Sequence, residues 1–162
     1  MEIKFRSRCV GIGDKRREIP VLVATMKIEK FTLRATIILP ARFQENRKVP
    51  ENFGLAIFKG KPLYDHFFTF AKNPNAIVRY SFKDDKPTWE VAGKKVVTAV
   101  CKTSKTTCVD YGVSTEIYDN AEKANAALEK YGLSVEKIQQ FYEEFKNELE
   151  LEKEKYFAKN QS

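Results

Sequence analysis

Short runs of alternating apolar and polar residues dominate the first 118 residues of this 162-residue chain. They are rich in Val, Ile, Thr and Phe and are separated by turn residues, which is typical of β-strands. The expected strands cover residues 3–9, 20–28, 31–39, 54–59, 76–82, 88–92 and 95–101. From about residue 119 the apolar period becomes that of helices. We therefore expect an α+β fold, a mostly antiparallel β-sheet of hairpins and meanders followed by two C-terminal α-helices.

The clearest local pattern is a hairpin formed by residues 21–28 and 31–39. If Glu29 and Lys30 form a two-residue turn, one face of both strands is wholly apolar. The facing pairs on it are Ile28–Phe31, Met26–Leu33, Ala24–Ala35 and Leu22–Ile37. The other face is cationic near the turn and apolar at its far end. Because Glu-Lys is a poor type I′ turn, we expect a longer or bulged loop there.

Two further turns are expected at residues 83–86 and 92–95, where Asp, Gly and Lys separate apolar runs. They would connect the strands 76–82, 88–92 and 95–101 into a meander.

The first helix is expected to start at Asp119, with Glu122 placed as in a capping box, and to stop at Gly132. The second is expected to run from Ser134 to Phe157. Its apolar positions have helical spacing and are Val135, Ile138, Tyr142, Phe145, Leu149 and Tyr156. This stripe either packs on the sheet or forms a short dimeric coiled coil. In the second case Ile138, Tyr142, Phe145 and Leu149 would be the homodimer contact.

The charge of the chain, formally +7, is unevenly distributed. Residues 1–118 hold 22 Lys and Arg against 12 Asp and Glu, whereas residues 119–162 hold 7 against 10. We expect a single domain, in which an acidic helical segment, 119–162, packs on a basic β-rich body, 1–118. A basic body suits an anionic partner. A surface rich in Lys and Glu, as in thermophile proteins, is the alternative interpretation.

Basic and aromatic residues are interleaved on the expected strands and loops. Cationic side chains neutralise phosphates, and exposed rings stack on unpaired bases. The sequence therefore predicts a small, basic, non-catalytic nucleic-acid-binding protein that favours single-stranded DNA or RNA. The predicted site comprises Lys15, Arg16, Arg17, Lys27, Lys30, Arg34, Arg79, Tyr80, Phe82, Trp89, Lys94 and Lys95. The alternative for the three rings is burial in the core. Neither expected helix is basic, which argues against a major-groove recognition helix.

The three cysteines are too few for a closed four-cysteine zinc site. If Ser104 and Lys105 form a turn, Cys101 and Cys108 lie opposite each other, where a cross-strand disulfide is sterically allowed. A mesophile cytosol would keep both reduced. The cationic, hydroxyl-rich tip between them suits a phosphate or a plain solvated turn.

Enzyme motifs are mostly absent, so we expect no enzyme and no cofactor or metal. A metal-dependent nuclease using Asp84, Asp85 and Glu90 is the weak alternative. The single histidine, His66, lies in the aromatic segment 63–70, which we expect in the core. The alternative function is a protein–protein interaction module, such as a viral or phage-encoded inhibitor or accessory subunit.

No apolar run approaches the ~20 residues of a membrane span, and the first ten residues lack the apolar stretch of a secretory signal. We therefore expect a cytoplasmic protein without a membrane partner.

Overall fold

In the part of the chain that the structure describes, a seven-stranded antiparallel sheet with its strands in chain order is followed by two helices. This computed structural model describes residues 2–38, 52–62 and 70–159. The strands are β1 (Glu2–Val10), β2 (Arg17–Ile28), β3 (Phe31–Ile38), β4 (Leu55–Lys59), β5 (Ala76–Lys83), β6 (Lys86–Lys102) and β7 (Thr107–Tyr118). The helices are α2 (Ala121–Leu128) and α3 (Val135–Lys159), and the 3-10 turns are η1 (Gly13–Lys15), η2 (Phe70–Lys72) and η3 (Glu129–Tyr131). The predicted α+β class is confirmed.

The β2–β3 hairpin has the predicted register, from Ile28 opposite Phe31 to Leu22 opposite Ile37. Its loop is a tight two-residue turn, so the expectation of a longer loop is wrong. Glu29 adopts a left-handed backbone (φ 53°), which costs a residue with a side chain about 1–2 kcal/mol. The Glu29 carboxylate also lies 3.1 Å from the Lys137 ammonium of α3, which holds the turn against the helix.

The expected turn at residues 83–86 is confirmed, because Lys83 pairs with Lys86. Asp84 and Asp85 both have positive φ values, 52° and 62°, as a type I′ turn requires.

The expected turn at residues 92–95 is wrong, because β6 continues through it as one strand. Gly93 and Lys94 form a bulge between the pairs Ala92–Thr115 and Lys95–Val113. A Cβ at Gly93 would lie 2.6 Å from Ser114 Oγ, which itself accepts a hydrogen bond from the Lys94 N–H. Glycine here permits a close approach of β7 instead of a chain reversal.

Polar side chains start both helices. Asn120, one residue after the expected start, accepts hydrogen bonds from the N–H groups of Glu122 and Lys123 and begins α2. Gly132, in a left-handed conformation, ends η3 as expected. Ser134 Oγ accepts a hydrogen bond from the Lys137 N–H in the first turn of α3.

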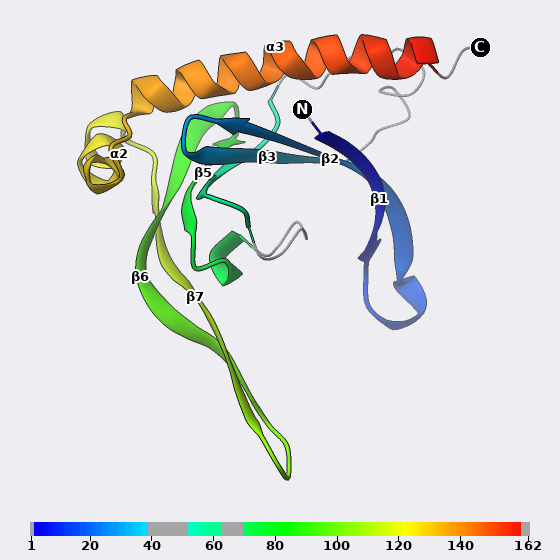
Figure 1. Ribbon diagram of the computed structural model, residues 1–162, viewed down its shortest axis with the longest axis vertical. Coiled ribbons are helices and arrows are strands. Elements are labelled where there is room, and N and C mark those ends of the chain that lie inside the picture. The colour runs from blue at the N-terminus through cyan, green and yellow to red at the C-terminus, as the bar shows by residue number, and fades with distance from the viewer. Residues whose placement is uncertain (1, 39–51, 63–69, 160–162) are drawn as a thin grey trace.

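Helix α3 packs across one face of the sheet (Figure 1) and buries the apolar side of the β2–β3 hairpin. Its core residues are Ile138, Phe141, Tyr142, Phe145 and Leu149, all at most 4% exposed. The predicted dimer contact through Ile138, Tyr142, Phe145 and Leu149 is therefore wrong. These side chains are instead buried in the core, where α3 covers the sheet.

The opposite sheet face, called here the inner face, carries the alternate residues of each strand. One row across it comprises Thr25, Arg34, Ala56, Arg79 and Glu90. A smaller apolar cluster is buried on this face, where η2 contributes Phe70 against Phe58 and Val113. At the two edges of the sheet, the β1–β2 and β6–β7 hairpins extend away from α3 (Figure 1).

We predict that Leu149→Ala destabilises the protein by about 2–5 kcal/mol, because the Leu149 side chain is fully buried on the side of α3 that packs on the sheet. The matched control is Leu151→Ala on the same helix, where the side chain is 55% exposed and the expected change is below about 0.5 kcal/mol. Urea unfolding measures both. Equal destabilisation would contradict the assigned face of α3.

Burial raises the pKa of the Tyr142 phenol from 10.0 to about 12. The folded state therefore binds the phenolic proton more tightly than the unfolded state. This contribution to the free energy of unfolding is complete below pH 10 and is lost as the pH rises toward 12. We predict that Tyr142→Phe makes urea unfolding less pH-dependent between pH 10 and 12. An unchanged slope would contradict the shift.

Candidate nucleic-acid interface

The turn between β1 and β2 gathers three of the predicted cations, Lys15, Arg16 and Arg17, and all three are exposed. The turn depends on Gly11, whose backbone is left-handed (φ 93°). A Cβ there would lie 2.3 Å from the Lys15 carbonyl oxygen, so no other residue fits without rearrangement. The local geometry thus presents a compact cationic tip at one edge of the sheet.

At the other edge, β6 and β7 continue beyond the body of the sheet as a two-stranded ribbon (Figure 1). We call residues 94–111 the arm. Every described side chain in it is exposed. The arm carries four lysines against one acid, and the charged residues are Lys94, Lys95, Lys102, Lys105 and Asp110. Among the residues that the structure describes, none of the four lysines takes part in a salt bridge.

The predicted site included Lys94 and Lys95 but missed Lys102 and Lys105. The sequence does show the cationic, hydroxyl-rich composition of residues 102–106, which suits a phosphate or a plain solvated turn. Only the pairing of β6 with β7 places all four lysines on one projecting element.

Hydrogen bonds close the tip of the arm. The Thr103 N–H donates to the Thr106 carbonyl oxygen over 2.8 Å, and the two threonine hydroxyls lie 2.8 Å apart. Ser104 and Lys105 form the turn, as predicted. The register then places Cys101 directly opposite Cys108, and both are exposed free thiols in this structure.

The predicted stacking surface is wrong for Tyr80 and Trp89, each of which is only 4% exposed. Both point toward α3, and the Tyr80 hydroxyl donates to Gln139 Oε1 over 3.0 Å. Phe82 is partly buried against the same core. Strand alternation explains the result, because all three rings lie on the sheet face that α3 covers.

Four predicted cations of the central strands are dispersed rather than gathered. Lys27 is exposed on the inner face, whereas Lys30 lies at the turn beneath α3 with its ammonium 5.5 Å from the Phe31 ring centre. Arg34 is buried, at 5% exposure, and its guanidinium lies over the Phe58 ring. Arg79 pairs with Glu90. The prediction of Arg34 as a surface contact is therefore wrong, and Arg79 has a carboxylate partner within the fold.

Arg34 and Arg79 both line a cavity of about 350 Å³ on the inner face. Two small residues line it, Gly54 just before β4 and Ala56 within β4. Its polar lining residues are Arg34, Thr36, Asn52, Arg79 and Ser81. Gly54 and Ala56 leave the space between the longer side chains of β3 and β5. The cationic groups here are engaged by rings and by Glu90, so the cavity is polar but not an open cationic surface.

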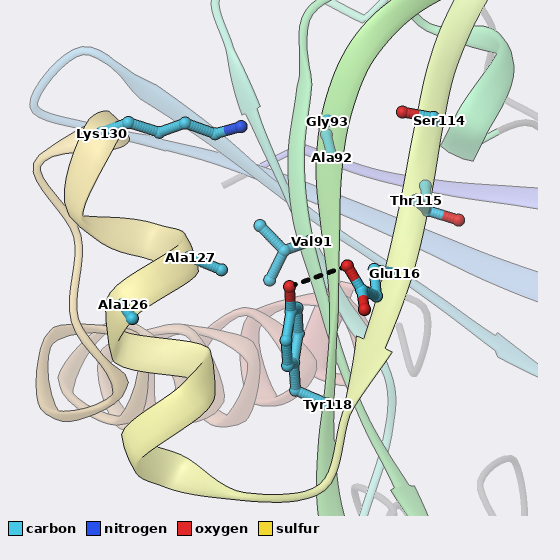
Figure 2. A pocket seen from close by; sticks show the side chains of 10 residues that line it. All are labelled: Val91, Ala92, Gly93, Ser114, Thr115, Glu116, Tyr118, Ala126, Ala127 and Lys130. Carbon is cyan, nitrogen blue, oxygen red and sulfur yellow. Dashed lines mark hydrogen bonds between the residues drawn. The ribbon is translucent and has the colours of Figure 1, made fainter.

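A second cavity, of about 320 Å³, has two walls (Figure 2). One wall is formed by α2 and η3, and the other by the strands β6 and β7. The Tyr118 hydroxyl donates to Glu116 Oε2 over 3.0 Å, and this hydrogen bond is the main cause of a raised pKa of Tyr118. Lys130 extends from the helical side toward Ala92 and Gly93 (Figure 2). The tyrosine acts as a donor to the carboxylate and is not poised to lose its proton.

Within residues 2–38, 52–62 and 70–159, no group of three or more His, Cys, Asp or Glu side chains is placed to hold a metal ion. His66 and the rest of segment 63–69 lie outside the described residues. The expectations that the protein is not an enzyme and has no cofactor stay predictions. In the described part of the chain, neither helix combines the length and the apolar character that crossing a bilayer requires.

Comparison with protein families, with curated proteins and with solved structures gave no match to this chain.

The predicted disulfide is tested by thiol titration of protein purified without reductant. Both thiols are free in this structure but lie opposite each other across the ribbon, so oxidation can join them. We predict one reactive thiol in the denatured, unreduced protein and three after reduction. Cys108→Ser is the control and should give two thiols in both conditions. Three thiols in the unreduced denatured protein would contradict the disulfide.

Proposed function

We propose that this protein binds nucleic acid without catalysis, through phosphate contacts made by two cationic hairpins. The observation that supports this most is the separation of charge across the sheet. The cationic tips lie on the hairpins that extend away from α3 (Figure 1). The helical segment, residues 119–162, has a surplus of acidic residues and lies on the other side of the sheet.

Exposure of the cations supports the same proposal. Their side chains meet solvent at both edges of the sheet and comprise Lys15, Arg16, Arg17, Lys94, Lys95, Lys102 and Lys105. A polyanion that reaches both hairpins would release a counterion for each phosphate that a cation neutralises. Base stacking has no place in the proposed interface, because Tyr80 and Trp89 are buried.

A protein partner is the alternative proposal, because exposed apolar side chains such as those of the arm also occur at protein–protein contacts. Salt dependence discriminates between the two. Counterion release from nucleic acid gives a linear fall of log affinity with log salt, with a slope of about −0.9 per phosphate contact on a duplex.

We predict that a fluorescein-labelled oligonucleotide binds at 50 mM salt, and that its affinity falls at least about a hundredfold by 200 mM. The double variant Lys102→Gln/Lys105→Gln should weaken binding and lower the slope by about one for each lysine that contacts a phosphate. Fluorescence anisotropy measures both quantities.

The matched control is Lys83→Gln/Lys86→Gln, which removes two lysines from the tip of another hairpin. That tip is formed by β5 and β6, beside the helical layer (Figure 1). The affinity of this control variant for the oligonucleotide should equal that of the unmodified protein. Absence of binding at 50 mM salt, or equal losses in both double variants, would contradict the proposed interface.

A further inference from the structure

The side of the arm that continues the inner face carries a row of exposed apolar side chains. Val97 pairs with Tyr111, and Val100 pairs with Val109, across the two strands. Their exposed fractions range from 39% to 55%. Strand alternation places them on the same side as Val113, which is buried in the inner-face cluster at the base of the arm. We call Val97, Val100, Val109 and Tyr111 the apolar stripe.

The bulge in β6 after Val97 keeps the stripe continuous. Without the extra residue, Val100 would point to the opposite side of the ribbon from Val97. The register shifts between Val97 and Ala99, so that Val100 returns to the side of Val109 and Tyr111. The fold thus places four apolar side chains on one side of a ribbon that pairs with no third strand among the described residues.

Lysines flank the stripe at both ends on the same side of the ribbon. Lys95 pairs with Val113 at the base, and Lys102 pairs with Thr107 near the tip. The Lys95 ammonium lies 4.6 Å from the Tyr111 ring centre, so this ring is covered by a cation. Their partners in β7, Val113 and Thr107, are six positions apart, so at ~3.3 Å per residue the backbones of the two lysines lie roughly 20 Å apart.

We propose that the arm enters the major groove of double-stranded DNA, with the stripe against the base edges and the flanking lysines on the phosphates of the two strands. This proposal rests on the proposed function and names its ligand. The major groove is about 12 Å wide and admits a two-stranded β-ribbon. Lysines about 20 Å apart therefore reach the backbones on both sides of it.

The composition of the stripe favours a duplex over the other anionic partners. Aliphatic side chains such as Val97 and Val100 contact thymine methyl groups, but they offer no ring on which an unpaired base stacks. The only ring in the stripe, that of Tyr111, lies beneath Lys95. Two arms of separate copies would bring like charges together, because the arm carries four lysines and one aspartate.

The test compares two sets of substitutions on the same ribbon. Val97→Thr/Val100→Thr keeps the size, charge and β-propensity of the side chains but replaces one methyl group of each by a hydroxyl. Val96→Thr makes the same change on the other side, where the side chain is 37% exposed. Because the arm lies outside the core, all variants should keep the melting temperature of the unmodified protein.

Fluorescence anisotropy is measured on an A·T-rich 20-base-pair duplex, on one of its strands alone, and on polyglutamate, at the same salt concentration. We expect the duplex to bind most tightly. The stripe variant should weaken duplex binding about tenfold and leave single-strand binding unchanged, whereas Val96→Thr should change neither.

The outcomes separate the two proposals. Equal duplex affinity in the stripe variant, or equal binding of duplex and single strand, overturns groove entry while the proposed function stands. Tighter binding of polyglutamate than of the duplex overturns groove entry in favour of an acidic protein partner. Failure of both nucleic acids to bind overturns the proposed function itself.

Discussion

The packing of α3 on one face of the sheet is the interaction on which the rest of the structure depends. The helix contributes Ile138, Phe145 and Leu149, all fully buried, and its Tyr142 ring stacks on Phe53 with the ring centres 4.8 Å apart. At about 25 cal/mol per Å² of apolar surface, such a layer supplies a large part of the driving force for folding. Because one side of the sheet is closed in this way, any ligand must approach from the edges or from the inner face.

This constraint also organises the charge of the molecule. A helix with one apolar stripe must point its remaining residues to solvent, and in α3 these are rich in glutamate. The hairpins at the two sheet edges are not covered by the helix and carry exposed cations. The acidic helical layer and the cationic hairpin tips therefore lie on opposite sides of the sheet (Figure 1). An anion approaching the protein is repelled by the helical side and attracted by the hairpins.

The arm shows how local irregularities produce a surface. Gly93 permits the close approach of β7, and the second bulge returns Val100 to the side of Val97. Bulges bend a strand and increase its twist. These two bulges explain why the expected turn at residues 92–95 is one long strand, and why the apolar side chains beyond it lie on one side.

Some of this architecture follows from local pattern alone. The period of two in residues 21–38 requires one apolar face, and a two-residue turn at Glu29 and Lys30 then selects the register, so the β2–β3 pairing could be predicted residue by residue. The same logic placed Cys101 opposite Cys108. The helical period of residues 135–149 likewise identified the side chains that α3 buries, although not what they pack against.

Tertiary structure alone decided which sheet face is covered, and therefore which rings and cations meet solvent. Tyr80 and Trp89 alternate with Arg79 and Glu90 along the strands, and this pattern is the same whichever side is buried. The choice depends on where α3 docks, a contact between residues more than fifty positions apart. Local sequence determines how side chains alternate, whereas burial is a property of surfaces that only the folded chain brings together.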